Sequence, residues 1–448
     1  MSQHRPTTPS PLIVLALVAA LAAIAGLSLS ARPSHAQTAP AGDPSYGINF
    51  VNYHEPWLPL AVESGAGVVR WQFNWRDYEL SPGVWAWETS DKPIYLWNSA
   101  GLQVHAILHY PPYFWAANQP GGLMPGNLGL PWNDSENGWG RFCNRFAQRY
   151  QGQIASYEVW NEPDVSHFWD GTPEQYYELL KDCYQGIKAA DPAVPVSMAG
   201  VMVADSGLFP QVLRAAAADP EGATHNHFFD VVSIHAYNDP ERVYELAGQA
   251  HGALEQHGLG DKPIWLTEFG IPVRGYGTMP DSPDYNRATE EEAAWYLLQA
   301  ISNGHAAGVE RMMVYRLADD YADEAFGLMR IDHSQRPAYR AYQLAVGLMR
   351  DIESASHTVG EDGVVVNEMR RADGVRVVAV YSLQGTAHEV SLPAEKGLGV
   401  LYNAAGETRP LQADAEGQYT FSLPEAAGRD FSQPWLYSVG GPVLILVE

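Results

Sequence analysis

The sequence predicts an α/β fold, a (β/α)8 TIM barrel followed by a small C-terminal antiparallel β-sandwich domain. Strand-like and helix-like segments alternate from residue 46 to 350, and eight strands can be counted there. After Arg350 the chain changes to short strands and turns alone. Eight parallel strands separated by helices make a closed barrel the natural architecture. A chain of 448 residues is long enough for one barrel and one smaller domain.

Each expected barrel strand is a short run of apolar and β-branched residues. We expect these strands at 46–50, 67–73, 103–109, 154–160, 194–199, 231–235, 263–267 and 311–315. Two of the intervening helices have clear starts, because Thr172 precedes Pro173 and Gln175, and Thr289 precedes three glutamates. We therefore expect that this glutamate run serves helix capping and is not a site.

The C-terminal part is expected to contain only strands. They are predicted at 363–367, 375–382, 388–392, 400–402, 419–423 and 442–447. Exposed aromatic residues are few there, so a domain that packs on the barrel is favoured over a sugar-binding module. The predicted boundaries are a linker at 37–45, the catalytic barrel at 46–350 and the sandwich at 351–448.

Residues 1–36 are expected to be an export signal and not part of the fold. Arg5 precedes an unbroken run of small and apolar residues at 12–29, and Ser34-His35-Ala36 is typical of a small-residue cleavage site. The run of 18 residues is also just long enough for a retained membrane anchor. We expect a secreted protein, extracellular or periplasmic, with an anchor as the alternative.

The charge and cysteine content narrow the possible partners. A net charge of −25 argues against nucleic acid and anionic membranes, which need basic patches. Cys143 and Cys183 lie on helices that would be neighbours in a barrel, so a disulfide and two buried thiols both remain open. We expect a monomer without a cofactor.

Two glutamates carry the chemical signal. Glu162 lies in Trp160-Asn161-Glu162-Pro163, and Glu268 lies in Thr267-Glu268-Phe269-Gly270, each near the end of a predicted buried strand. In a barrel, the C-terminal strand ends form the active-site face. Retaining glycoside hydrolysis needs two carboxyl groups about 5 to 5.5 Å apart, one as acid/base and one as nucleophile.

These motifs resemble the strand-four and strand-seven signatures of the clan of (β/α)8-barrel retaining glycoside hydrolases with two catalytic glutamates. The string at 157–164 is similar to family 39 and its polysaccharide-cleaving bacterial relatives, and family 5 is nearly as close. The resemblance covers roughly residues 46–350. It implies that Glu162 is the general acid/base, that Glu268 is the nucleophile and that Asn161 contacts the sugar 2-hydroxyl.

The resemblance also implies supporting residues around the nucleophile. Arg70 matches the clan's strand-two arginine, and His235 and Tyr237 match a pair of donors after strand six. A satisfied core histidine is the alternative for His235. Tyr315 stands where the clan commonly has a tryptophan platform, and the following Arg316 weakly suggests an acidic sugar.

Aromatic residues after strands three and four are expected to line an extended cleft that binds several sugar units. The alternative is that they anchor loops by being buried. The candidates for sugar contact are His109, Trp115 and Trp169, with Tyr113, Phe114, Trp132, Trp139 and Phe168 as further candidates.

Two other groups are expected to be structural. Glu158 shares the face of Glu162 but lies roughly 13 Å deeper, so we expect a paired carboxylate in the barrel core. His225 and His227 are expected to lie in a loop without a third metal ligand, so no metal site is predicted.

Together these observations predict a secreted retaining glycoside hydrolase that cleaves a β-linked polysaccharide or oligosaccharide. The alternatives are a family 5-like endoglucanase or mannanase, a transglycosylase, and a catalytically inactive barrel that binds polysaccharide. An extended cleft favours internal cleavage. The sugar and its linkage stay open.

Overall fold

The computed structural model describes residues 42–117, 124–202, 207–274, 288–319, 325–426 and 438–448. The predicted export signal lies outside these residues. Among the described residues, no helix combines the length and the apolar character needed to cross a membrane.

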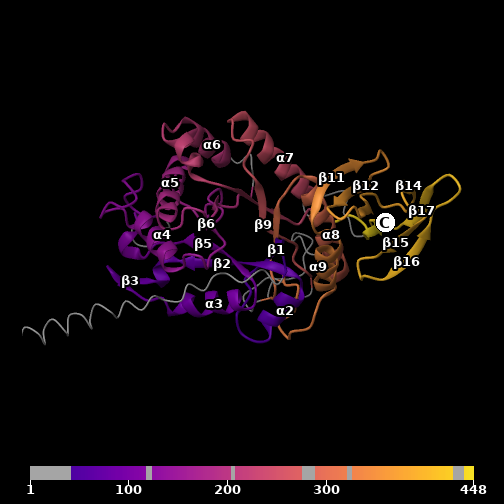
Figure 1. The fold of residues 1–448 in the computed structure, drawn as a ribbon, viewed down its shortest axis with the longest axis horizontal. Coiled ribbons are helices and arrows are strands. Elements are labelled where there is room, and N and C mark those ends of the chain that lie inside the picture. Colours follow the sequence, from indigo (N-terminus) through magenta and orange to yellow (C-terminus); the bar gives the residue numbers. More distant parts are fainter. Residues whose placement is uncertain (1–41, 118–123, 203–206, 275–287, 320–324, 427–437) are drawn as a thin grey trace, which may run out of the picture. The chain divides into compact units, whose positions relative to one another are not determined.

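Eight parallel strands form the barrel (Figure 1). The sheet order is β7-β6-β5-β2-β1-β10-β9-β8. The sheet closes between its two ends, where the Met198 amide donates to the Val231 carbonyl at 3.1 Å and the Val201 amide to the Ser233 carbonyl at 3.3 Å. The predicted fold class is confirmed. The strands are β1 (Asp43–Asn49), β2 (Ala66–Asn74), β5 (Gln103–His109), β6 (Ser156–Val159), β7 (Val196–Met198), β8 (Val232–Tyr237), β9 (Ile264–Gly270) and β10 (Arg311–Val314).

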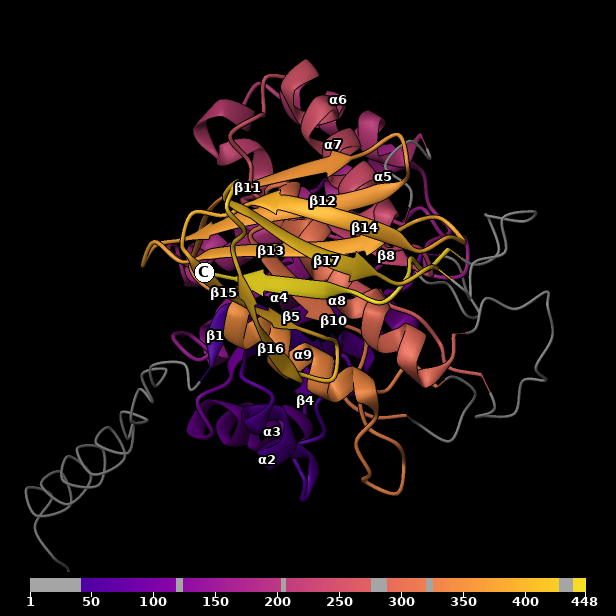
Figure 2. The same cartoon turned by 90° about the vertical axis from the view of Figure 1, so that its right-hand side faces the viewer.

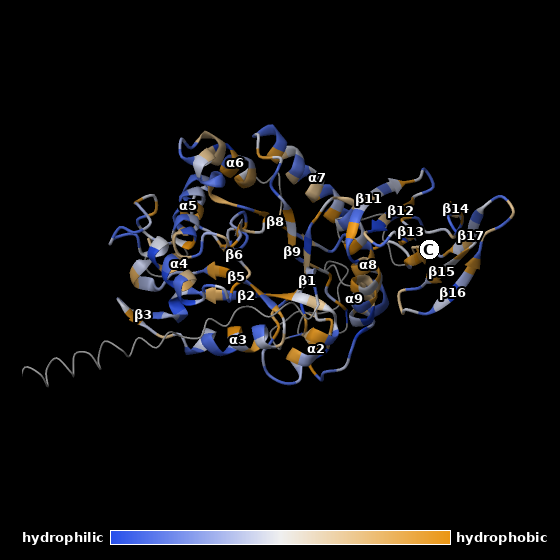
Figure 3. Ribbon diagram, in the orientation of Figure 1, coloured by the Kyte–Doolittle hydropathy of each residue, from blue (hydrophilic) through white to orange (hydrophobic). Residues whose placement is uncertain are grey.

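Helices surround these strands, and Figure 3 shows hydrophobic residues along strands such as β5 and β9. The capping boxes predicted at Thr172 and Thr289 are both present. Each threonine hydroxyl accepts from the backbone amide of the third helical residue, Gln175 or Glu292. The side chain of that residue in turn accepts from the backbone amide of the threonine. The helices are α2 (Trp57–Glu63), α3 (Glu88–Ser99), α4 (Gly138–Arg149), α5 (Pro173–Ala190), α6 (Leu208–Ala218), α7 (Glu241–Gln256), α8 (Glu290–Ala306) and α9 (Pro337–Leu348).

A disulfide joins two neighbouring helices of the barrel wall. Cys143 in α4 and Cys183 in α5 are bonded at an S–S distance of 2.09 Å, with their Cα atoms 5.3 Å apart. The alternative of two buried thiols is therefore wrong.

The C-terminal strands form a six-stranded sheet in the order β11-β12-β13-β18-β15-β16 and a two-stranded sheet of β14 and β17. Val378 and Val380 of the first sheet share one hydrophobic cluster with Val390 and Phe421 of the second. These strands are β11 (Ile352–Val359), β12 (Val364–Arg371), β13 (Arg376–Ser382), β14 (His388–Pro393), β15 (Leu398–Tyr402), β16 (Thr408–Gln412), β17 (Gln418–Leu423) and β18 (Leu444–Val447).

The six-stranded sheet packs on the barrel through α8 (Figure 2). The Asn367 amide donates to the Asn303 side-chain oxygen at 2.7 Å, and the Gln299 amide donates to the Gly441 carbonyl at 2.8 Å. All three of these amide side chains are fully buried. The contact is therefore a specific polar one as well as an apolar one.

Several strands were missed or misplaced by the sequence prediction. The edge strands β11 and β16 are mostly exposed, so they carry no apolar run, and β16 contains Pro410. The short hairpin of β3 (Glu79–Ser81) and β4 (Val84–Trp85) also lacked a signal. β1 begins at Asp43, inside the expected linker, because Asp43 pairs with Ala66.

Candidate active site

Glu162 and Glu268 lie at the C-terminal ends of their strands, where the prediction expected them. Glu162 follows β6 with a left-handed φ of 43°, and its amide donates to the Gly200 carbonyl at 3.1 Å. Glu268 lies on β9 at an irregularity in the pairing with both neighbours. His235 pairs with Glu268 whereas Ile234 pairs with Leu266, so Thr267 is an extra residue on β9. Such a bulge changes the direction of the following side chain.

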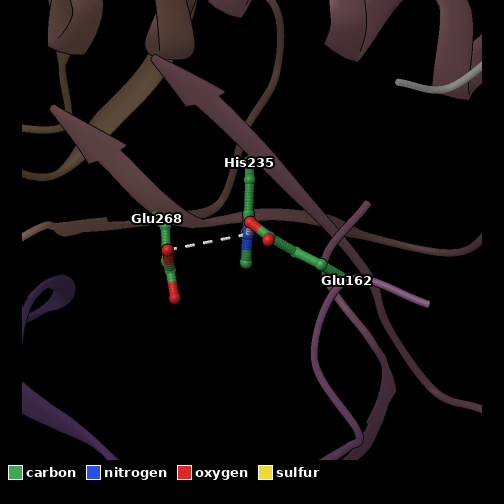
Figure 4. Close-up of side chains that lie close together, drawn as sticks. All are labelled: Glu162, His235 and Glu268. Carbon is green, nitrogen blue, oxygen red and sulfur yellow. Dashed lines mark hydrogen bonds and ion pairs between the residues drawn. The ribbon is translucent and has the colours of Figure 1, made fainter. Parts of the chain in front are cut away.

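The two carboxyl groups face each other across a short gap. Single ligand atoms of Glu162, His235 and Glu268 all lie within 4.8 Å of one another. Figure 4 shows the three side chains converging from three different segments, with His235 between the glutamates. An oxygen–oxygen distance in this range fits the close spacing of a retaining pair and not the 6.5 to 9.5 Å of an inverting pair.

Glu268 is held by two strong donors. Arg70 Nη1 donates to its Oε1, and the Tyr237 hydroxyl donates to its Oε2. Burial by itself raises the pKa of Glu268, but the charges of His235 and Arg70 together with these hydrogen bonds hold it below its ordinary value. Glu268 is therefore an ionised carboxylate, the form that a nucleophile requires.

Glu162 is bound by His235. The His235 Nδ1 atom lies 2.7 Å from Glu162 Oε1, and its Nε2 atom lies 3.1 Å from the Thr267 hydroxyl. The expected donation from His235 to Glu268 is wrong as a hydrogen bond, because that distance is 3.7 Å and the ring is turned toward Glu162. Burial lowers the pKa of His235, but Glu268 and Glu162 outweigh it and raise the pKa above its ordinary value.

Arg70 connects the active site to the barrel core. Its Nε atom donates to Glu158 at 2.8 Å and its Nη1 atom to the Asn49 side chain at 2.8 Å, and a weaker bond of 3.1 Å reaches Asn161. Glu158 also lies 2.8 Å from His105 Nε2. Burial raises the pKa of Glu158, but Arg70 and His105 prevail and lower it. Glu158 is thus a paired carboxylate in the core, as expected.

The two glutamates line a cavity of about 490 Å³. This volume is within the usual range for small-molecule sites. Of the predicted site residues, Asn161, Tyr237 and Tyr315 line it together with Glu162 and Glu268. Arg70 and His235 are fully buried behind it. Lining residues that the sequence prediction missed are Phe50, Gln72, Ile107, Val165, Met202, Asn238 and Phe326.

Three predicted sugar-contacting residues lie elsewhere. His109 is fully buried, and its Nδ1 atom lies 2.9 Å from Gln72 Nε2, so it reaches the cavity only through Gln72. Trp169 is 4% exposed and packs edge-on against Trp160. Trp115 lines a different depression, where its ring stacks on Trp75.

The further aromatic candidates divide in the same way. Trp139 is buried in the core, Trp132 lines the same depression as Trp115, and Tyr113 is largely exposed. Phe168 lines the catalytic cavity. Phe50, Tyr237, Tyr315 and Phe326 also line this cavity, but they come from other segments. Among the described residues, the expectation that aromatic residues after β5 and β6 line the cleft is therefore wrong apart from Phe168.

Glu162, His235 and Glu268 are also the one group of at least three potential metal ligands found among the described residues. Their ligand atoms already bind protein partners, namely each other, Arg70 and Tyr237. The guanidinium on Glu268 would repel a cation placed beside that carboxylate. The arrangement therefore fits acid–base and nucleophilic chemistry better than metal binding.

Comparison with known proteins agrees with this geometry. The sequence model of Glycosyl hydrolases family 39 matches residues 137–260, a stretch that includes Asn161, Glu162 and His235. The resemblance to family 39 is confirmed. A curated β-xylosidase from Geobacillus stearothermophilus is 21% identical over 286 residues, which are 56% of this chain and 52% of the relative. The match thus spans about half the length of that curated relative.

Solved structures share the fold. A family 39 glycoside hydrolase from Bacteroides cellulosilyticus WH2 aligns with a TM-score of 0.67 at 18% identity, over 91% of this chain and 81% of that chain. A family 30 endoxylanase from Clostridium papyrosolvens C71 aligns with a TM-score of 0.60 at 12% identity, over 92% and 98%. At such identities the likeness establishes the barrel and its C-terminal strands, not the substrate.

Proposed function

We propose that this chain is a retaining β-glycosidase in which Glu268 is the nucleophile and Glu162 is the general acid/base. The observation that carries the proposal is the pair of carboxylates that lie within 4.8 Å of each other, each with its own set of partners. Arg70 and Tyr237 favour an ionised Glu268. Glu162 has a hydrogen bond to His235, which can share a proton with it.

The reaction would proceed in two displacements. A Glu268 oxygen attacks the anomeric carbon while Glu162 gives its proton to the departing glycosidic oxygen, so the aglycone leaves as an alcohol and a glycosyl ester forms on Glu268. Glu162 then takes a proton from water, and the water oxygen displaces Glu268 from the anomeric carbon. The sugar leaves with its original β configuration.

We propose a terminal β-xyloside as the substrate. One relative is named a β-xylosidase and a structural neighbour an endoxylanase, so both act on xylosidic bonds by name. The aromatic residues that suggested an extended cleft lie mainly elsewhere, and of these only Phe168 lines the cavity in the described part of the chain. We therefore favour removal of single sugars over internal cleavage.

We also propose export, guided by residues 1–36. N-terminal sequencing of the protein from the culture fluid of an expression host should find a mature start just after Ala36. An uncleaved, membrane-bound product would contradict cleavage and support the anchor.

The roles of the glutamates can be separated with two variants. Glu268→Ala should lose turnover on every substrate, because no ester can form. Glu162→Ala should still cleave aryl β-xylosides with good leaving groups, which need little protonation, while cleavage of xylobiose falls by about 10²- to 10⁴-fold. Azide should restore Glu162→Ala and yield the β-xylosyl azide.

Glu174→Ala is a matched control, because Glu174 is exposed on the first turn of α5 and should not affect turnover. Azide rescue of Glu268→Ala with retained configuration would reverse the two roles. The wild-type product time course decides the mode of action: xylose alone from the first minutes supports terminal attack, and early mixed oligosaccharides overturn it.

A further inference from the structure

A second depression lies on the outside of the barrel wall, between the β3–β4 hairpin, the turn at Tyr113–Trp115 and helix α4. We call it the outer pocket and define it by Trp85, Trp115, Trp132, Asn133, Arg145 and Gln148. Its volume is about 380 Å³, and none of its described lining residues lines the catalytic cavity.

Trp115 is held firmly in this pocket. Its indole N–H donates to Glu79 Oε2 at 3.1 Å, and its ring stacks on Trp75 with centroids 6.0 Å apart. The side chain of Glu79 is buried, and Trp75 and the Gly83 amide also donate to it. Both oxygens of the Glu79 carboxylate therefore accept hydrogen bonds from the protein, and this carboxylate fixes the position of the Trp115 ring.

Two glycines at the start of α4 make room for the tryptophans. A Cβ atom on Gly138 would lie 2.6 Å from the Trp115 ring, and one on Gly140 would lie 2.7 Å from the Trp132 carbonyl. Glycine in a helix costs roughly 1 kcal/mol relative to alanine. Glycine at these two positions allows the Trp115 ring and the Trp132 backbone to lie directly on the helix.

Trp85 completes the apolar surface. Its ring lies nearly parallel to Phe142, with an interplanar angle of 5°, and the Arg145 guanidinium lies 4.8 Å from its centroid. Trp85, Trp115 and Trp132 are each only half-buried, although tryptophan in a purely structural role could be covered completely, as Trp139 of α4 is.

The polar groups of the pocket are mostly neutral amides and arginines. Asn133, Arg145 and Gln148 are exposed at its edge. Flat indole rings beside side-chain donors and acceptors suit a sugar chain, whose ring faces are apolar and whose hydroxyls project sideways.

We propose that the outer pocket binds a segment of β-linked glycan chain independently of the catalytic cavity. The choice of a β-linked glycan rests on the proposed function, in which the enzyme attacks the chain ends of such a polymer. A polymer bound in the outer pocket would be kept close to the active site. The two sites would therefore act on the same polymer, one by holding it and the other by cleaving it.

The test uses the mature chain with Glu268→Gln, which blocks turnover, and soluble xylan as the probe in affinity gel electrophoresis. The parent should be retarded by xylan. Adding Trp85→Ala and Trp132→Ala should weaken binding by at least about tenfold, equivalent to 1.4 kcal/mol. Trp57→Ala is the matched control, because Trp57 is a half-buried tryptophan on α2 that should leave retardation unchanged.

A second pair, Asn133→Ala and Gln148→Ala, removes exposed amides with little risk to folding and should weaken binding in the same direction. A parent that xylan does not retard, or an amide pair that binds xylan like the parent, overturns the proposal.

With active Glu268, the Trp85→Ala and Trp132→Ala variant should keep its kcat/KM on aryl β-xyloside and lose it on xylan. A chain that binds xylan here but cleaves no glycoside would contradict the proposed function alone.

Discussion

The catalytic cavity and the outer pocket are built in opposite ways. Glu162 and Glu268 stand on strand ends above a closed network of buried charges that includes Arg70 and Glu158. The outer pocket lies on a helix, a hairpin and a loop, and the buried carboxylate of Glu79 accepts hydrogen bonds from Trp115 of the pocket and from Trp75. The buried charges of the catalytic cavity thus lie at the ends of barrel strands. The tryptophan rings of the outer pocket lie where a hairpin, a loop and α4 meet at the surface.

This difference follows from what each site must do. Bond cleavage requires charges in fixed positions before the reaction begins, and a buried network supplies them at low reorganisation cost. Binding a chain requires only an exposed surface of suitable shape, which loops and helix faces can provide. Changes in the strand network should therefore affect both stability and turnover, whereas changes around α4 should affect stability and polymer binding alone.

The largest effect is expected for Arg70→Met. The variant leaves Glu158 and Glu268 buried without their cation, and removal of one partner from a buried pair costs about 3 to 5 kcal/mol. We expect a free energy of unfolding lower by that amount in denaturant titrations and loss of turnover on aryl β-xylosides. Arg214→Met on the exposed face of α6 is the control. Full activity in Arg70→Met would contradict the role of the network.

The disulfide tests the other region. Replacing Cys143 and Cys183 with alanine frees a crosslink that spans 40 residues, which should lower the free energy of unfolding by about 2 to 4 kcal/mol. The bond joins α4 and α5, away from the catalytic carboxylates, so kcat on aryl β-xylosides should stay unchanged. Denaturant titration and kinetics of the same preparation check both parts. A fall in kcat without unfolding would show that the two regions are coupled.

The contrast also explains what the sequence could predict. Glu162, Glu268 and the capping boxes at Thr172 and Thr289 were predicted because each signal lies within a few adjacent residues. The direction of the loop after β5 was not, since it depends on Trp115 stacking against Trp75 and on the space above Gly138. Such contacts join distant segments and leave no local pattern.

Two features of the active site were hidden for the same reason. The bond from His235 to Glu162 depends on the pairing irregularity at Thr267, which shifts β9 relative to β8. Gln72 enters the cavity supported by His109, a contact between neighbouring strands. The resemblance placed His235 near Glu268, which lies 3.7 Å from its Nδ1 atom, but did not predict its hydrogen bond to Glu162.

A pH experiment probes the support beneath the outer pocket. Burial raises the pKa of Asp182 to about 7, although Asn137 and the Gly129 amide donate to it. The folded chain therefore keeps a proton that the unfolded chain, with a pKa near 3.9, has lost, so this contribution to stability fades as the pH rises through 7. From pH 5 to pH 8, the free energy of unfolding of Asp182→Asn relative to wild type should therefore rise by about 2 to 3 kcal/mol, because two pKa units lie between pH 5 and the folded pKa. A difference between the two chains that is the same at both pH values would contradict the raised pKa.

The smallest expected effect is also the most selective, and it concerns Gly200. A Cβ atom there would overlap the His235 imidazole. The Gly200 carbonyl accepts from the Glu162 amide at 3.1 Å, and the Gly200 amide donates to Glu158 at 2.9 Å. These two bonds hold the Gly200 backbone in place, so it cannot easily move away from His235. Gly200→Ala should therefore push the imidazole away from Glu162 and impair proton transfer without touching either carboxylate.

We expect Gly200→Ala to lower kcat by about tenfold on glycosides with poor leaving groups and to have much less effect on those with good ones, because only the former need full protonation. A series of aryl β-xylosides of increasing leaving-group pKa measures this as a steeper dependence than in wild type. Gly248→Ala on α7 is the control, since no atom lies within 4 Å of its added methyl group. An equal loss on all substrates would mean that Gly200 supports the fold alone. A loss that grows with leaving-group pKa would show that the space beside this glycine positions His235 for the acid step.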